Sequence, residues 1–437
     1  MAKLAINGGA PVRAPGGKLA AWPISDPVDA ALVARITKSN RWSFDGKYEW
    51  EFAEKFTKYQ TAKYGLCCAN GTVGIQIALE ALNIGAYDEV IVPGITWQAT
   101  ASACLDVNAI PVLTDVEPET WCLDLKQVEA NITPRTKAVI VVHLYGSTCD
   151  IDGLVRLCKK HHLYLIEDCA HQHGTFWKGK GVGSFGDVSS WSFQESKVLS
   201  SGEGGFNMCK TKELFEKIYS LRNCGRPYPA CPPVFGLKKP SAMETALHSG
   251  NYRLTEWQAA LLLGGLRRMD RQVKLRDKNA VYLNSLLAEI PGVSPMGRRP
   301  QITQQSYFNF AFQIDPKELG VSNHVFCAAL NAELSMSDAF EPPYEPLNKC
   351  GLYKPLTKAR YHISKQFMKA IEPGRFKLPA CEDAHFRSGV CIHHVMLMNT
   401  KKEMDQIAEA VSKVVANKAE LKHVKGGSGR KYRPLAI

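Results

Sequence analysis

Three short segments of the chain carry residue types that could do chemistry together. An apolar run, Leu163 to Ile166, leads directly into Glu167-Asp168, and a second strand-like run, Val188 to Phe193, is followed within a few residues by Lys197. The third segment is Asn70-Gly71-Thr72, a turn of small residues ahead of a helical pattern. The exposed N–H groups at the start of a helix suit a phosphate.

A carboxylate, an amine and a phosphate cradle are the groups that an enzyme using pyridoxal phosphate requires. The lysine forms a Schiff base with the cofactor aldehyde, and the carboxylate keeps the pyridine nitrogen protonated so that the ring can accept electrons. An aromatic residue stacks on the ring, and Trp97, which follows the strand-like run Glu89 to Pro93, could make that contact. The pattern therefore favours pyridoxal 5'-phosphate chemistry at Lys197 and Asp168.

Each of these residues also has an ordinary structural interpretation. A lysine after a strand is usually a surface residue, an aspartate at a strand end is often a helix cap, and a lone tryptophan is more often part of the core. His171 and His173 have a spacing that two metal ligands could use, but no third ligand is evident in the sequence, so no metal is expected. The fourteen cysteines contain no Cys-x-x-Cys pair, which argues against a zinc framework.

The elements that must position these residues alternate from about Gly65 to Met208. Short apolar strands alternate with helical patterns, which is typical of a parallel sheet covered on both faces. Ligands of such sheets lie at the carboxyl ends of the strands. The expected strands are 89–93, 110–113, 138–143, 163–166 and 188–193, and the expected helices are 73–82, 98–107 and 151–161.

The C-terminal half begins with a long helical stretch, Thr255 to Ile290, in which Gly264-Gly265 predicts a bend. The final helix is marked by a capping box of Thr400 and Glu403. We therefore expect an α/β protein with a large domain and a smaller C-terminal α+β domain. The predicted parts are an N-terminal arm 1–11, a large domain 12–265, a small domain 266–417 and a basic flexible tail 418–437.

The formal net charge of +12 could indicate a polyanionic partner. Five of these excess charges fall within 418–437, and no helix-turn-helix, zinc finger or aromatic-basic stripe accompanies them, so we expect no nucleic-acid partner. No run approaches the ~18 apolar residues of a membrane span, and no apolar segment of a secretory signal follows Met1. The expected setting is the cytoplasm, without a membrane partner.

These motifs resemble those of the DegT/DnrJ/EryC/StrS family of sugar and cyclitol aminotransferases, which are fold type I pyridoxal phosphate enzymes. The most specific segment is Ser192-Phe193-Gln194-Glu195-Ser196-Lys197, followed by Gly202-Glu203-Gly204-Gly205. Glu167-Asp168-Cys169-Ala170-His171-Gln172-His173-Gly174 and Asn251-Tyr252-Arg253-Leu254-Thr255-Glu256 match two further family segments. The resemblance starts at Gly8-Gly9-Ala10-Pro11-Val12-Arg13 and covers nearly the whole chain. It implies a mostly parallel sheet of the seven-stranded type in the large domain.

The resemblance also implies a role for each site residue. Lys197 carries the Schiff base, Asp168 pairs with the pyridine nitrogen, His171 lies beside the ring and Trp97 stacks on it. Asn251 is expected to reach the cofactor phosphate of a neighbouring subunit, since these active sites are built at the interface of a homodimer. The residues implied to contact the phosphate within one subunit are Gly71, Thr72 and Ser192.

Many nucleotide-sugar members have histidine in place of Gln194, and the run Ser192 to Val198 with this glutamine is most similar to the cyclitol branch, which aminates scyllo-inosose or 2-deoxy-scyllo-inosose. The aminohydroxybenzoate synthases also have glutamine at this position. The implied reaction is a ping-pong transfer of an amino group from glutamine or glutamate to the ketone of a cyclitol or sugar. The alternatives are a 3-amino-5-hydroxybenzoate-synthase-like dehydratase or aromatase, a nucleotide-ketosugar aminotransferase, and a regulatory protein that only binds the cofactor. Glu195 and the segment Met336 to Pro346 depart from the family pattern on the substrate-contacting surface.

Overall fold

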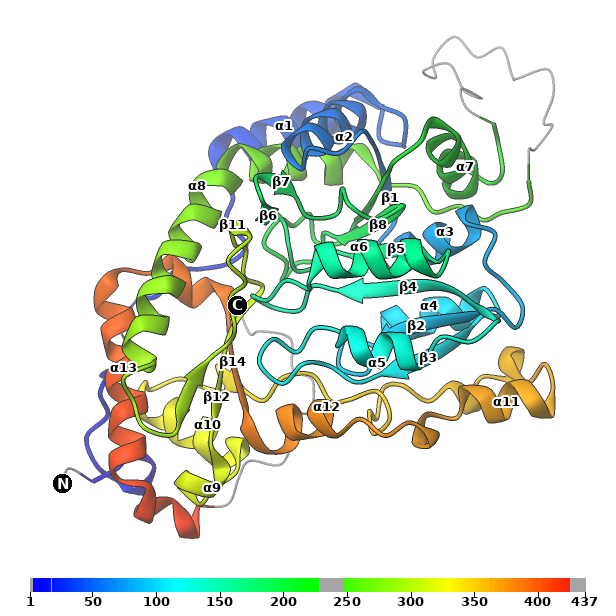
Figure 1. Ribbon diagram of the computed structural model, residues 1–437. Coiled ribbons are helices and arrows are strands. Elements are labelled where there is room, and N and C mark those ends of the chain that lie inside the picture. Colours follow the sequence, from blue (N-terminus) through cyan, green and yellow to red (C-terminus); the bar gives the residue numbers. More distant parts are fainter. Residues whose placement is uncertain (1–2, 17, 228–246, 425–437) are drawn as a thin grey trace.

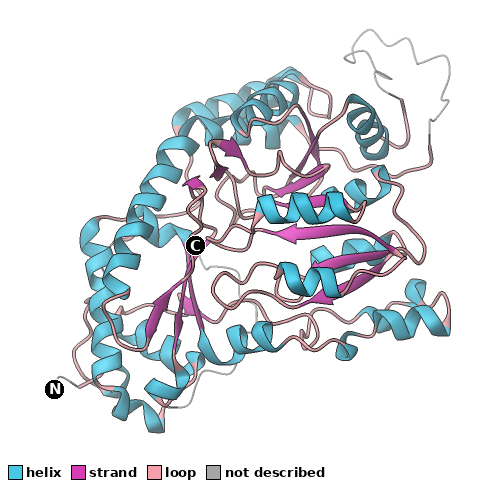
Figure 2. Ribbon diagram, viewed as in Figure 1, coloured by secondary structure: helices cyan, strands magenta, loops and turns pink. Residues whose placement is uncertain are grey.

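The computed structural model describes residues 3–16, 18–227 and 247–424, and its centre is a seven-stranded sheet between layers of helices (Figures 1 and 2). Strand β9 runs antiparallel to both of its neighbours, and the other six strands run parallel to one another. The mostly parallel α/β sheet predicted from the sequence is therefore confirmed. In spatial order the strands are β1 (Tyr64–Cys68), β9 (Gly205–Cys209), β8 (Val188–Ser192), β5 (Tyr164–Asp168), β4 (Thr136–Val142), β2 (Glu89–Pro93) and β3 (Ile110–Thr114).

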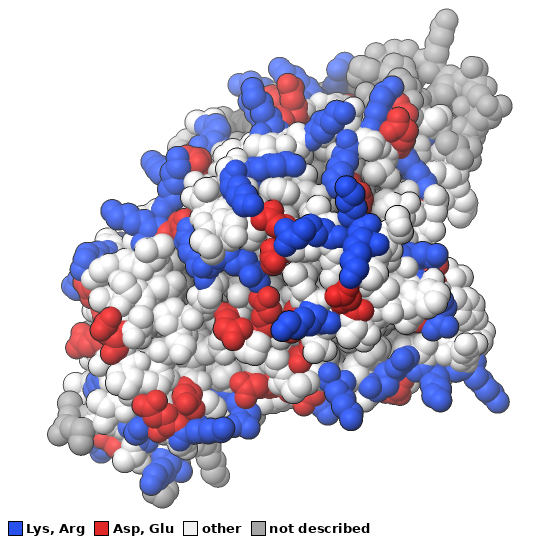
Figure 3. All heavy atoms as spheres, viewed as in Figure 1, with Lys and Arg blue, Asp and Glu red and all other residues white. Residues whose placement is uncertain are grey.

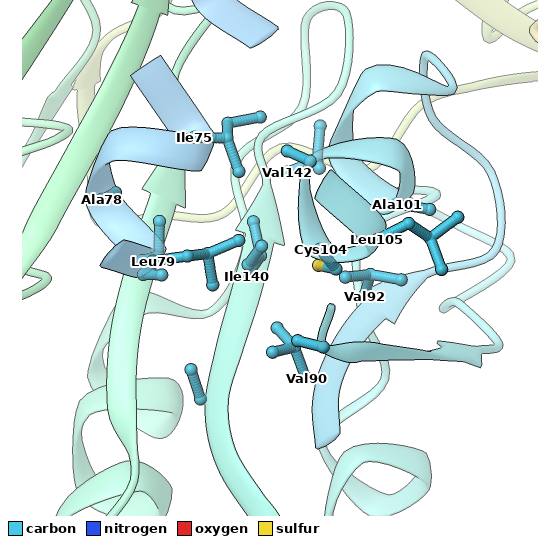
Figure 4. Packing of buried hydrophobic residues seen from close by; sticks show 14 of the residues in the cluster. Ile75, Ala78, Leu79, Val90, Val92, Ala101, Cys104, Leu105, Ile140 and Val142 are labelled. Atoms are coloured by element: carbon cyan, nitrogen blue, oxygen red, sulfur yellow. The ribbon is translucent and has the colours of Figure 1, made fainter. Parts of the chain in front are cut away.

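Alternate residues of the central strands point to opposite faces, and each face has its own hydrophobic core. On one face, Val90, Val92, Ile140 and Val142 pack against α3 and α4, as Figure 4 shows. On the other face, the neighbouring strand residues pack against α5 and α6. The helices of this region are α1 (Pro27–Ser39), α2 (Lys47–Tyr59), α3 (Gly71–Ala81), α4 (Ala99–Asp106), α5 (Leu125–Ala130), α6 (Ile151–Lys160) and α7 (Lys212–Arg222).

Helix α8 (Glu256–Leu287) is 32 residues long and connects the region around the large sheet with the C-terminal region. It begins at the capping box of Thr255 and Gln258 and runs through Gly264-Gly265 without interruption. The predicted domain boundary between 265 and 266 therefore lies inside one helix, and the division into domains stays a prediction. None of the helices within the described residues is both long and apolar enough to cross a membrane.

The C-terminal region is built on a four-stranded antiparallel sheet in the order β10, β12, β14, β13. Its last helix carries the capping box of Thr400 and Glu403 that the sequence predicts. The strands are β10 (Val293–Pro295), β12 (Asn309–Ile314), β13 (Phe340–Glu341) and β14 (Gly389–His393), and the helices are α9 (Pro316–Leu319), α10 (Asn323–Glu333) and α13 (Lys401–Ala416). A separate small sheet joins β11 (Ile302–Gln304) to β6 (Phe176–Trp177) and β7 (Lys180–Gly181).

One part of the C-terminal half packs on the large sheet rather than on its own sheet. The segment with α11 (Lys365–Ile371) and α12 (Pro379–Asp383) extends beneath β3 in Figure 1. Its apolar side chains, among them Tyr353, Phe367 and Leu378, belong to the same core as β2 and β4. Burial of this apolar surface ties the two halves of the chain together.

The start of the segment predicted to be a flexible tail is a 3-10 helix, Lys418–His423, packed on the C-terminal region. Leu421 is buried in the core of that region, and the Glu420 carboxylate accepts hydrogen bonds from the Leu4 amide and the Asn7 side chain. These residues differ from the prediction because one apolar side chain with a place in the core can order a short, charged segment. The remainder, 425–437, lies outside the described residues.

The surface carries charged side chains of both signs (Figure 3). On the face that Figure 3 shows, lysine and arginine side chains are interspersed with aspartate and glutamate. Ion pairs among the described residues include Lys178 with Asp152 and Arg298 with Asp277. The expectation of no nucleic-acid partner stays a prediction.

We predict that Leu421→Ala lowers the free energy of unfolding by about 2–5 kcal/mol, because it removes a buried side chain from a packed core. The measurement is chemical denaturation of the full chain. The control is Lys422→Ala, one residue away and exposed, which should change stability by less than about 0.5 kcal/mol. Equal effects of the two substitutions would contradict the packing of this segment.

Candidate active site

The predicted lysine and aspartate both lie at the carboxyl ends of neighbouring parallel strands. Asp168 is the last residue of β5, and Lys197 lies in the loop after β8. Both side chains are buried, with exposed fractions of 7% for Asp168 and 9% for Lys197. Each residue acts on the other electrostatically, since the Asp168 carboxylate stabilises the Lys197 ammonium.

Burial brings the pKa values of Lys197 and Asp168 closer together. It lowers the pKa of Lys197 to about 8, although the Asp168 charge acts in the opposite direction. Burial also raises the pKa of Asp168, and hydrogen bonds from the Ala170 amide and the Thr100 hydroxyl counteract that rise. A lysine with a lowered pKa supplies a neutral, nucleophilic amine near neutral pH.

The small-residue turn forms a helix N-terminus that fits closely against the end of β8. Asn70 caps α3 by accepting a hydrogen bond from the Val73 amide at 2.9 Å, so Gly71 and Thr72 are the first residues of the helix. A Cβ atom on Gly71 would lie 2.9 Å from the Cβ atom of Ser192, closer than side chains tolerate. Glycine therefore permits the approach that brings Ser192 beside the free amides of this helix start.

His171 is held by one hydrogen bond and two aromatic neighbours. Its Nδ1 accepts a hydrogen bond from the Tyr145 amide at 3.2 Å, and its ring stacks on those of Tyr145 and Phe308. Burial and the nearby Lys197 charge hold the pKa of His171 well below its ordinary value, so the ring is neutral. His173 contacts the carbonyl of Ser192 instead, so the two histidines have separate roles and do not form a ligand pair.

A second cluster is formed by His143, Glu167 and Cys169, which are buried and have possible metal ligand atoms within 4.8 Å of one another. Its hydrogen bonds explain this closeness. Glu167 accepts from the amides of Gly183, Phe185 and Gly186 and contacts His143 Nε2 at 3.3 Å. His143 Nδ1 accepts from the Cys149 amide, which leaves the proton on Nε2, facing the carboxylate.

Trp97 and Asn251 lie at more open positions than the other predicted site residues. Trp97 follows β2, is 40% exposed, and has its ring 5.9 Å from that of Tyr344. Asn251 is exposed and accepts a hydrogen bond from Arg253 Nε at 2.7 Å. The structure thus groups Lys197, Asp168 and His171 in a buried centre, whereas Trp97 and Asn251 are exposed.

Several residues of the site have no signal in the sequence. Phe308 lies under the lysine, with Lys197 Nζ 3.9 Å from the centre of its ring. Tyr145 packs on His171, and its hydroxyl accepts a hydrogen bond from the Tyr344 amide at 2.7 Å. Tyr344 belongs to the segment Met336 to Pro346, which departs from the family pattern. Its place near Trp97 makes that segment part of the site wall.

The loop that carries Lys197 is held from two directions. Trp22 Nε1 donates to the carbonyl of Glu195 at 2.9 Å, and His394 Nε2 donates to the carbonyl of Ser196 at 3.1 Å. Arg276 fixes this tautomer because its Nε donates to His394 Nδ1 at 3.1 Å. The N-terminal segment and the C-terminal region thereby fix the two peptide groups that precede the lysine.

A buried lysine and carboxylate at the carboxyl edge of this sheet place the chain in the fold type I class of transferases. Within that class, a match to a family model narrows the assignment to one family. Residues 24–379 match the DegT/DnrJ/EryC1/StrS aminotransferase family, and the chain belongs to that family. The resemblance seen in the sequence motifs is therefore confirmed.

Named relatives cover nearly the full length of the chain. An L-glutamine:2-deoxy-scyllo-inosose aminotransferase of Streptoalloteichus tenebrarius is 41% identical over 430 residues, covering 96% of this chain and 99% of the relative. A putative L-glutamine:3-amino-2,3-dideoxy-scyllo-inosose aminotransferase of Micromonospora echinospora is 38% identical with the same coverage. The crystal structure of a 3-amino-5-hydroxybenzoic acid synthase superimposes with a TM-score of 0.78 and 27% identity, covering 91% of this chain and 99% of the synthase.

We predict that the reactivity of Lys197 toward a small aldehyde follows its lowered pKa. In the protein without cofactor, reductive methylation by formaldehyde should rise with pH and reach half its maximum near pH 8, because only the neutral amine reacts. Mass spectrometry of the Lys197 peptide gives the extent. Asp168→Asn should move the midpoint to lower pH, since the Asp168 charge raises the lysine pKa. A midpoint near 10.5, the ordinary lysine value, would contradict the burial effect.

Proposed function

We propose that this protein transfers the amino group of L-glutamine to the ketone of 2-deoxy-scyllo-inosose. The observation that carries the proposal is the 41% identity, over almost the whole length of both chains, to a relative that bears this activity in its name. The buried pair of Lys197 and Asp168 supports it, because amino transfer needs a nucleophilic amine beside a carboxylate. A second acceptor, 3-amino-2,3-dideoxy-scyllo-inosose, is favoured by the 38% identical relative.

The 3-amino-5-hydroxybenzoic acid synthase is a weaker guide to the reaction of this chain. Its structure matches the fold closely, but the sequence identity of 27% is well below that of the cyclitol relatives. The intact Lys197 and Asp168 also argue against a protein that only binds the cofactor as a regulator, since both groups needed for transfer are present.

We propose that the cofactor is pyridoxal 5'-phosphate, and the residues present fit such a group. The close approach of Gly71 to Ser192 leaves a side-chain-free edge at the first amides of α3, including that of Thr72, which suits the phosphate. Asp168 offers a buried carboxylate for the pyridine nitrogen, and Lys197 offers the amine for the aldehyde. His171, buried near Lys197, and Trp97, which follows β2, would contact the ring of the bound cofactor.

When bound, pyridoxal phosphate supplies an electrophilic carbon and a ring that takes up electron density. The residues of the chain supply the proton transfers. Lys197 Nζ would act as the general acid and base, accepting a proton from the α-carbon of glutamine and, in the second half of the reaction, donating a proton to the former ketone carbon of the acceptor. A positioned general acid or base of this kind contributes about 10²–10⁴-fold to the rate.

The surroundings of Lys197 suit both protonation states of its amine. The Phe308 ring and the Asp168 carboxylate stabilise the ammonium form, whereas burial favours the neutral form. Because these effects oppose each other, the amine can gain and lose a proton near neutral pH. The neutral His171 adds no positive charge that would disturb this balance.

We also propose that the protein works as a homodimer in which Asn251 reaches the cofactor phosphate of the partner subunit. Support comes from its exposed position and from Arg253, which orients its side chain. The Asn251 main chain also pairs with Asn223, so the residue stands on an ordered segment.

The proposed reaction can be tested directly. The purified protein loaded with pyridoxal phosphate should convert glutamine and 2-deoxy-scyllo-inosose into the aminocyclitol, detected by mass spectrometry. Lys197→Ala should lower the rate by at least about 10²–10⁴-fold and abolish the visible absorbance of the lysine-bound cofactor. Lys178→Ala, at an exposed lysine paired with Asp152, is the matched control and should retain activity.

The same assay also discriminates between possible acceptors. Scyllo-inosose, 3-amino-2,3-dideoxy-scyllo-inosose and a nucleotide-linked ketosugar should be offered in parallel to the amine-loaded protein. Turnover of a nucleotide-linked ketosugar with no response to any cyclitol ketone would contradict the proposed substrate, and retained turnover by Lys197→Ala would contradict the proposed chemistry.

Mixing two inactive variants tests whether the site is shared between subunits. Lys197→Ala and Asn251→Ala proteins should each be impaired alone, the first severely and the second through weaker cofactor binding. If the two chains are mixed and reassembled, about a quarter of the sites should combine an intact Lys197 with an intact Asn251 from the partner, and activity should recover to that extent. No recovery, with mixed dimers demonstrated by differently tagged chains, would place Asn251 in its own subunit's site.

A further inference from the structure

A chain of two threonine hydroxyls ends on the carboxylate of Asp168. Thr100 Oγ1 donates to Asp168 Oδ2 at 3.0 Å, and Thr96 Oγ1 lies 3.1 Å from Thr100 Oγ1. All three side chains are buried, and Thr100 is fully inaccessible. The hydrogen bonds between these side chains are therefore shielded from bulk water.

The hydrogen bonds run toward Asp168, because Thr100 Oγ1 is the donor to Asp168 Oδ2. A carboxylate can only accept, so Thr100 gives its single hydroxyl proton to Asp168. The Thr100 oxygen is then free to accept, and Thr96 fills that role. Hydrogen bonds in series polarise one another, so each link strengthens the next.

The second carboxylate oxygen is held differently. Asp168 Oδ1 accepts from the Ala170 amide at 3.2 Å, which is a main-chain contact that no substitution at Ala170 other than proline removes. The Lys197 charge also acts on the carboxylate. Thr100 is thus the side chain that supplies a neutral donor directly to Asp168.

We infer that Thr100, supported by Thr96, is a positioning residue that keeps Asp168 ionised and oriented for the pyridine nitrogen of the cofactor. The inference rests on the proposed use of pyridoxal phosphate and adds residues to that site. Thr96 and Thr100 flank Trp97 and the start of α4, so one short segment serves both the ring face and the carboxylate.

Physical chemistry explains why such support is needed. A carboxylate taken out of water is favoured in its neutral form unless hydrogen bonds or charges stabilise the anion. A neutral Asp168 could not hold a protonated pyridine nitrogen. Loss of the Thr100 hydroxyl should therefore weaken binding of a cofactor that has this nitrogen and leave unchanged the binding of an analogue that lacks it.

The test compares two ligands in three variants. Dissociation constants are measured by equilibrium dialysis for pyridoxal phosphate and for its analogue with carbon in place of the ring nitrogen. We expect Thr100→Val to weaken binding of pyridoxal phosphate by about 10- to 100-fold, the effect of losing one hydrogen bond to a charged group, with little change for the analogue. Thr100→Ser keeps the hydroxyl and should bind both ligands like the unaltered protein.

Thr96→Val removes only the hydrogen bond between Thr96 and Thr100. It should cause a smaller loss of affinity that is again selective for pyridoxal phosphate. This variant replaces Thr100→Val in the test if Thr100→Val does not fold. An equal loss for both ligands, or no loss for either, overturns the inference while the cofactor assignment stands. Failure of the unaltered protein to bind pyridoxal phosphate would overturn the proposed function and this inference with it.

Discussion

The structure depends on burying two ionisable groups of opposite charge at one sheet edge. Isolated burial of either group would be costly, because a charge taken out of water loses its hydration. Asp168 and Lys197 are tolerated because each supports the charged form of the other and because Thr100, Ala170 and Phe308 supply further contacts. The same burial gives the lysine its lowered pKa, so the constraint and the chemistry have one origin.

The parallel sheet is the means by which these groups meet. Strands β5 and β8 pair directly, and a parallel pairing brings both of their carboxyl ends to the same edge. The antiparallel β9 follows the lysine loop and returns along β8, and Gly205 lets the start of β9 approach Asn70 at the beginning of α3. Amine, carboxylate and helix N-terminus are therefore close together as a consequence of topology.

The sequence predicted the parts of this arrangement that local patterns encode. The five strands and three helices that the sequence predicted around the large sheet begin and end within about two residues of the expected limits, because apolar periodicity and caps such as Asp150 are local. Strands β1 and β9 of the same sheet were not predicted. Thr100, Phe308 and His394 were missed since their roles arise from contacts across 68 to 198 residues of chain, which no spacing reveals. Leu421 was missed for a related reason: one apolar residue in a basic segment gives no periodic signal.

The position of the lysine is set by segments from both halves of the chain. Trp22 holds the Glu195 carbonyl from the N-terminal side, whereas His394 holds the Ser196 carbonyl from the C-terminal region. Trp22 and His394 also contact each other edge to face, and Arg276 of the connecting helix α8 lies against both. The lysine loop can adopt its observed position only when these elements are packed together, so formation of the site is coupled to completion of the whole fold.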